Sequence, residues 1–88
     1  MTAIQSPTIE EQAQAKTLLQ DAQTTIVRWQ MRYSDTTPEF WGLRVAWEAL
    51  RFAWYVADRD PQSAADKLHL LKDAIADYEE RQAAPKGD

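Results

Sequence analysis

The stretch from Phe40 to Ala57, FWGLRVAWEALRFAWYVA, constrains the fold more than any other part of the chain. It holds three of the four tryptophans and both phenylalanines, whereas only Arg44, Glu48 and Arg51 are charged. On an α-helix at about 100° per residue, its apolar side chains cover roughly two thirds of the circumference. A surface helix normally shows an apolar arc of about 100° or slightly more. We therefore predict that this stretch is the buried middle helix of a helical bundle, with more apolar surface than two neighbouring helices would cover.

Helical phase sorts the side chains of this stretch into four rows. The polar row runs through Arg44, Glu48, Arg51, Tyr55 and Asp58. The large-residue row contains Leu43, Trp47, Leu50, Trp54 and Ala57. The small-residue row, where a neighbouring backbone can approach closely, contains Gly42, Ala46, Ala49 and Ala53. The aromatic row, between the small-residue row and the polar row, contains Trp41, Val45, Phe52 and Val56.

Capping signals on either side predict two further helices. The first begins with a capping box at Thr8-x-x-Glu11, and its apolar spacing predicts a helix over residues 8–33. The middle helix is predicted over 38–57, with Thr37 as N-cap before Pro38, although Thr36-x-x-Glu39 offers a competing capping box. The third is predicted over 61–82, because Asp60 can cap a helix that Pro61 opens.

The connections between these helices are only about four residues long, which makes successive helices antiparallel neighbours. The fold class that we predict is therefore all-α, a small up-down-up antiparallel three-helix bundle. Residues 8–82 form its single domain, and residues 1–7 and 83–88 are predicted to be disordered. The predicted core stripe of the first helix contains Ala15, Leu19, Ala22, Ile26, Trp29 and Tyr33, with Leu18 beside them. That of the third contains Ala64, Leu68, Leu71, Ile75 and Tyr78.

Composition excludes several classes of function. The chain has no cysteine, so disulfides, thiolate metal sites and cysteine nucleophiles are excluded, and a reducing cytoplasm is the location that we expect. A net charge of −4 argues against direct nucleic-acid binding, which normally requires a basic patch. The Phe40–Ala57 stretch is too short and too charged to span a membrane.

The residues of catalytic and metal chemistry are sparse. The single histidine, His69, has Asp66 and Asp73 as helical neighbours, so a carboxylate–imidazole–carboxylate cluster is possible. A metal site normally needs three or four good ligands, and this helix offers only one imidazole. Acid–base catalysis needs a carboxylate or histidine held in a cleft with a shifted pKa, whereas the acids here lie on outward faces by phase. We therefore expect no enzyme activity, no cofactor and no metal.

The aromatic row is the predicted partner-binding surface, because tryptophan, phenylalanine and arginine are enriched in protein–protein hot spots. The predicted contact residues are Trp41, Arg44, Val45, Glu48, Phe52 and Val56. They indicate a protein–protein interaction module, which is an adaptor, a subunit of a larger complex or a homodimer. The open alternative is that the long first helix covers this row as ordinary core.

The third helix supports a different hypothesis, in which an acidic face imitates nucleic-acid phosphates. The chain would then be an inhibitor that occupies a basic nucleic-acid-binding cleft of a partner protein. The residues of this face are Asp66, Asp73, Asp77 and Glu80. The simpler interpretation is a solvated helix face, because Lys67, Lys72 and Arg81 are interspersed with the acids.

Overall fold

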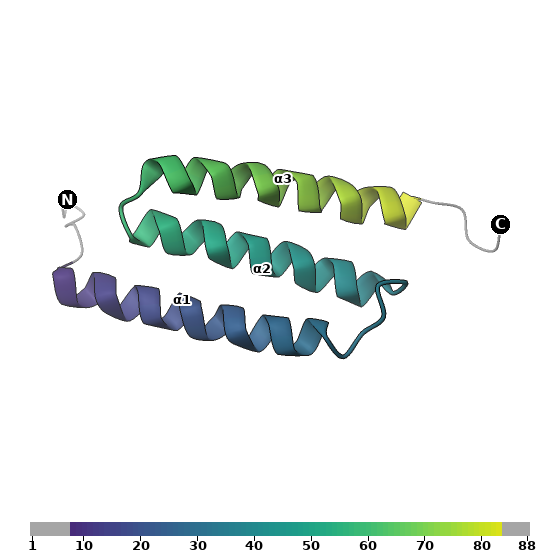
Figure 1. Cartoon of the computed structure of the whole chain (residues 1–88), viewed down its shortest axis with the longest axis horizontal. Helices are drawn as coiled ribbons and strands as arrows, with labels where there is room; N and C mark the ends of the chain where they lie inside the picture. Colours follow the sequence, from purple (N-terminus) through teal and green to yellow (C-terminus); the bar gives the residue numbers. More distant parts are fainter. Residues whose placement is uncertain (1–7, 84–88) are drawn as a thin grey trace, which may run out of the picture.

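A computed structural model describes residues 8–83, which form three α-helices. Helix α1 spans Ile9–Gln30, α2 spans Pro38–Ala57 and α3 spans Pro61–Ala83. They run antiparallel to their neighbours, with α2 in the middle (Figure 1). The prediction of an all-α, up-down-up three-helix bundle is confirmed. Of the segments predicted to be disordered, residues 1–7 and 84–88 lie outside the described residues, and Ala83 is the last residue of α3.

The first two helices begin at the predicted caps. The Thr8 hydroxyl accepts a hydrogen bond from the Glu11 N–H at 3.1 Å, and the Thr8 N–H donates to the Glu11 carboxylate at 3.0 Å. This second bond lowers the pKa of Glu11, because it stabilises the charged carboxylate. At α2, the Thr37 hydroxyl accepts from the Phe40 N–H at 3.4 Å. The competing box at Thr36 does not cap α2.

The third helix also begins as predicted. The Asp60 carboxylate accepts a hydrogen bond from the Ser63 N–H at 3.0 Å. Hydrogen bonds from Ser63 hold the pKa of Asp60 below its ordinary value. The bond from the backbone N–H of Ser63 has the larger effect and the bond from its side chain the smaller one. Asp60 therefore caps α3 in its charged form.

Helix α1 ends three residues earlier than predicted. It stops at Gln30, and the next N–H groups make shorter-range bonds: Arg32 donates to the Trp29 carbonyl and Tyr33 to the Gln30 carbonyl. The prediction that the helix continues to Tyr33 was therefore wrong. The apolar spacing includes Tyr33 although the backbone leaves the α-helix after Gln30, so spacing alone does not mark the end of the helix.

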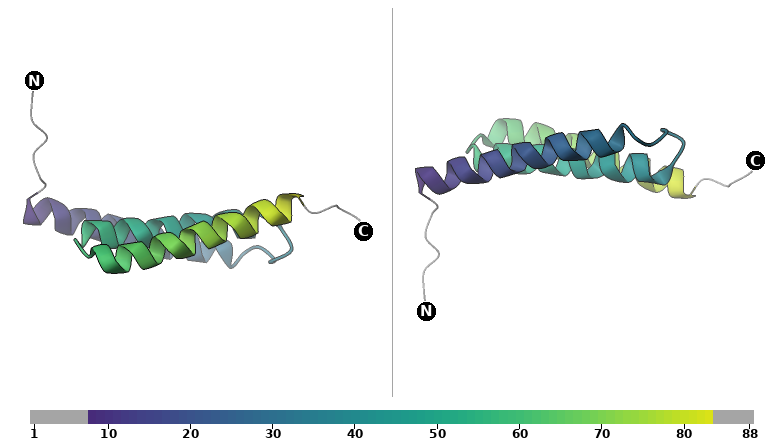
Figure 2. Two further views of the ribbon diagram at one scale, coloured as in Figure 1. Left: turned by 90° about the horizontal axis from the view of Figure 1, so that it is seen from above. Right: turned by 90° about the horizontal axis from the view of Figure 1, so that it is seen from below.

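The three helices form a single layer, not a closed triangle. Within the described residues, no Cα atom of α1 lies within 8 Å of one in α3. The two views along the layer show it as a thin, slightly twisted band (Figure 2). This arrangement follows from α2, whose large-residue row faces α1 while its aromatic row, roughly on the opposite side, faces α3.

Contacts at the ends of the helices fix the antiparallel registers. Lys16 Nζ lies 2.5 Å from Asp58 Oδ1, which joins the start of α1 to the end of α2. On the other side of α2, the Arg81 guanidinium lies 3.8 Å from the centre of the Trp41 ring. Lys67 Nζ lies 5.7 Å from the centre of the Tyr55 ring.

A single layer leaves little of the chain buried. Among the described residues, the only apolar side chains that are buried are Ala64 and Ala74. Several residues of the predicted core stripes are exposed instead, so these predictions were wrong. They are Ala15, Leu18, Trp29, Tyr33 and Ile75. The reason is geometric, because each outer helix packs against one neighbour only and buries only the narrow flank that touches α2.

The turn between α2 and α3 contains a strained residue. The N–H groups of Arg59 and Asp60 donate to the Val56 and Tyr55 carbonyls, which is the hydrogen-bond pattern of a Schellman motif. Arg59 therefore adopts a φ of 60°, in the left-handed region that glycine occupies without a steric penalty.

Replacing Arg59 by glycine is expected to raise the free energy of unfolding by about 0.5–1 kcal/mol, because the steric cost at Cβ disappears. The side chain is exposed and no packing is lost. Urea unfolding followed by circular dichroism measures the change. The control is Arg59→Ala, which removes the same side chain but keeps Cβ. Equal gains for alanine and glycine would contradict this account.

Candidate functional site

An apolar groove lies between α1 and α2 on one side of the layer. Its volume is about 610 Å³. Its lining residues are Ala22, Thr25 and Ile26 from α1, and Ala46, Ala49 and Leu50 from α2. The one polar side chain among them, Thr25, donates its hydroxyl to the Asp21 carbonyl at 3.1 Å. The groove therefore offers a ligand apolar contact without an unsatisfied side-chain polar group.

The groove is part of a wider apolar surface. Towards the α1–α2 connection it continues into a hollow lined by Trp29, Tyr33, Glu39, Gly42 and Leu43. On α3, helical phase places Leu68 and Ile75 on the same side of the layer. We call this side the open face. Helical phase, or for Tyr33 the hollow that it lines, places five large exposed apolar residues on this side, which are Leu18, Trp29, Tyr33, Val56 and Ile75.

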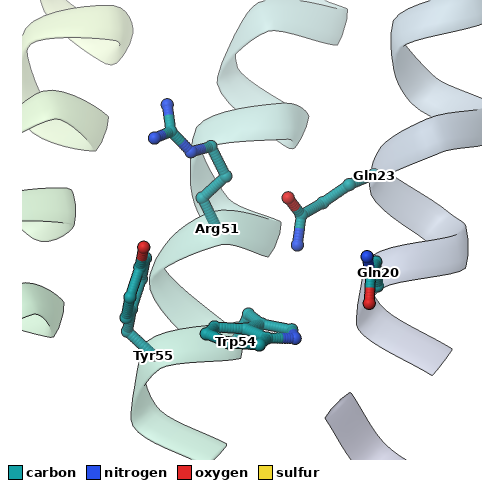
Figure 3. A pocket seen from close by; sticks show the side chains of 5 residues that line it. All are labelled: Gln20, Gln23, Arg51, Trp54 and Tyr55. Atoms are coloured by element: carbon teal, nitrogen blue, oxygen red, sulfur yellow. The ribbon is translucent and has the colours of Figure 1, made fainter. Parts of the chain in front are cut away.

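The opposite side of the layer is covered differently. Its cleft, of about 200 Å³, is lined by Gln20, Gln23, Arg51, Trp54 and Tyr55 (Figure 3). In the figure the Gln23 amide points towards the space between α1 and α2, above the Trp54 ring. Cations lie over the aromatic rings, with Lys16 4.7 Å from the Trp54 ring centre and Arg51 4.4 Å from the ring centre of Trp47. These cations and the two glutamine amides make this side of the layer more polar than the groove.

Glu48 lies in the interior, although the sequence places it in the outward polar row. Its exposed fraction is 1%, so the prediction that the acids face outward was wrong for this residue. Its two carboxylate oxygens lie 3.4 Å from Arg44 Nη2 and 3.5 Å from Arg51 Nη1. In the register that pairs Trp41 with Arg81, Glu48 lies opposite Ala74, which is small enough to leave room for a carboxylate.

The aromatic row faces α3. Trp41, Val45 and Phe52 are half-buried, and among the four residues of the row only Val56 is exposed, at 49%. The row is therefore a seam between α2 and α3, and the alternative in which the first helix covers it was wrong. Partner binding through this row stays a prediction. Apart from Val56, the surface that the fold leaves uncovered consists of other residues.

The acidic face of α3 is solvated. Asp66, Asp73, Asp77 and Glu80 are all exposed, as are the neighbouring Lys72 and Arg81. Imitation of nucleic-acid phosphates by these carboxylates stays a prediction.

His69 lies on the same helix, with its Nε2 3.9 Å from an Asp73 carboxylate oxygen. Within residues 8–83, no three histidine, aspartate or glutamate side chains are grouped so that they could hold a metal ion. Over the same residues, none of the helices has the length and apolar character needed to cross a membrane.

No family model matches the chain, and no curated protein or solved structure matches it either. The fold and the open face alone define its class, a three-helix layer that is apolar on one side. Sequence reasoning recognised the small-residue row as a place of close approach but assigned partner binding to the aromatic row. Two features of the sequence together could have indicated the open face. Helix α2 has a row of small residues, and α1 has apolar side chains, such as Leu18 and Trp29, that lie outside the flank packed against α2.

Proposed function

We propose that this protein is a protein–protein interaction module that binds through its open face. The observation that carries the proposal is the single layer, in which Ala64 and Ala74 are the only buried apolar side chains of the described residues. Stable domains are built from two or more packed layers around a shared core. A chain that forms one layer lacks the surface that would complete its core, and a partner can supply that surface.

The composition of the open face supports this role. The lining of its central groove contains no charge, so a partner can cover it without desolvating an ion. Around the groove, Leu18 is 71% exposed and Trp29 is 47% exposed. Burying a side chain of this size contributes about 1.5–3 kcal/mol, so a few of them can carry most of the affinity of an interface.

The proposal is tested by measuring whether the open face is accessible in the isolated chain. The sequence contains no cysteine, so a single introduced thiol reports one position. Thr25→Cys places the thiol in the groove, and Thr24→Cys places it on the neighbouring residue, which lines the opposite side with Trp47. The two positions are a matched pair, because both hydroxyls donate to the carbonyl four residues earlier and both residues are exposed.

At the lowest protein concentration that detection allows, the two thiols are expected to react with a maleimide at similar rates. Slow reaction of the Thr25→Cys variant alone at that concentration would mean that the chain covers its own groove. The proposed function would then be wrong.

A further inference from the structure

We infer that the occupant of the open face is a second copy of this chain, so that two three-helix layers pack face to face around a two-fold axis. The inference rests on the proposed function, because it requires the open face to be a binding surface. It adds the identity of the partner and the architecture of the complex.

The size of the open face fits a stable dimer. Helix α2 has 20 residues and is therefore about 30 Å long at ~1.5 Å per residue. Three helices at spacings of about 8–10 Å make a layer about 25 Å wide. A rectangle of these dimensions has an area of roughly 750 Å², which is of the same order as the ~800 Å² of accessible surface that each partner contributes to a stable interface of standard size.

Self-pairing also explains the apolar pattern of α2. Its neighbours α1 and α3 lie on opposite sides, and each covers one row of large side chains. The small-residue row between them faces the groove, with Ala46 and Ala49 in its lining. A second layer gives α2 a third helical neighbour on this side, and small side chains allow its backbone to approach closely. The remaining side carries Arg44 and Arg51 and needs no apolar cover.

The open face has the features that an isologous interface requires. In such an interface the same patch of both copies must fit itself, so it must carry protrusions as well as a hollow. Leu18 and Trp29 are exposed, and helical phase places them on the same side of α1 as the groove residues Ala22 and Thr25, where they can act as protrusions. Two-fold dimers are also the commonest form of soluble oligomer.

The test combines the solution mass with the reactivity of the same two thiols over a concentration series. Sedimentation equilibrium of the unmodified chain is expected to give twice the mass of one chain at high concentration. Over the same range, the maleimide reaction of Thr25→Cys is expected to slow in proportion to the fraction of dimer. The reaction of Thr24→Cys is expected to keep a constant rate.

The other outcomes separate this inference from the proposed function. If the chain is a monomer at all concentrations and the Thr25→Cys thiol is reactive, the inference that a second copy occupies the open face is wrong. The open face would then be left to a different protein. A dimer in which the Thr25→Cys thiol stays reactive would place the contact elsewhere and would also overturn the inference. A monomer in which this thiol is protected at every concentration would overturn both proposals.

Discussion

Replacing Glu48 by lysine is expected to remove a large part of the free energy of unfolding. Glu48 is 1% exposed and its carboxylate lies between Arg44 and Arg51, so the change removes the counter-charge that both arginines contact and adds a third cation. Breaking a buried ion pair in this way costs about 3–5 kcal/mol, which is a large part of the stability of a small domain. Urea unfolding followed by circular dichroism measures the loss.

Two control variants separate burial from charge. Glu79→Lys makes the same charge change at an exposed position of α3 and is expected to alter the free energy of unfolding by less than about 0.5 kcal/mol. Glu48→Gln keeps the shape and one acceptor oxygen, so it is expected to cost about 1–2 kcal/mol. A Glu48→Lys variant as stable as Glu79→Lys would show that the Glu48 carboxylate is solvated and that α3 does not cover it.

Replacing Ala49 by glutamate is expected to separate the proposed dimer without unfolding the helices. Ala49 lines the apolar groove, so in a face-to-face dimer the new carboxylate would lose its water and find no partner. We expect the dimer dissociation constant to rise by about 100-fold or more, which corresponds to ~2.7 kcal/mol. In the monomer the longer side chain can extend through the groove into water. Sedimentation equilibrium gives the dissociation constant, and circular dichroism gives the helicity.

A second groove variant and a control on the opposite side of the layer show whether the effect of Ala49→Glu comes from the open face. Thr25→Glu places the charge on the exposed α1 wall of the groove and is expected to separate the dimer even if Ala49→Glu disturbs the packing of α2. Thr24→Glu makes the same change on the opposite side of the layer and is expected to leave the dissociation constant near that of the unmodified chain. A dimer that tolerates both groove variants would rule out the open face as its interface.

The fold could be predicted because capping residues and prolines mark most of the helix ends in the sequence. The predicted bounds of α2 match those in the structure, since Pro38 fixes its first turn and the turn that begins at Asp58 ends it. Helix α3 is one residue longer than predicted. The end of α1 could not be predicted from spacing, because Tyr33 has a suitable phase and only the tight turn after Gln30 shows where the helix stops.

The faces were harder to predict than the helices, because more than one stripe fits the same spacing. On α3, a stripe through Ala74 has the same four-three rhythm as the predicted stripe through Ile75. The structure buries Ala74 and leaves Ile75 39% exposed. Close packing against a carboxylate selects the smaller residue, and this choice depends on Glu48, whose burial cannot be read from its own helix. The candidate site was missed for the same reason, since helical phase alone does not tell which row of α2 meets which neighbour.

The arrangement of α1 and α3 on opposite sides of α2 is tested by a distance between these two helices. Nitroxide labels on Asp21→Cys and Lys72→Cys report it, because both residues are exposed at similar heights in the layer. Double electron–electron resonance on labelled chain diluted with unlabelled chain removes distances between copies. The layer predicts helix axes about 16–20 Å apart, which is twice the usual ~8–10 Å spacing of packed helices. A distance that places the two axes about 8–10 Å apart would mean that α1 and α3 are in contact. That result would contradict the single layer, and with it the existence of an open face.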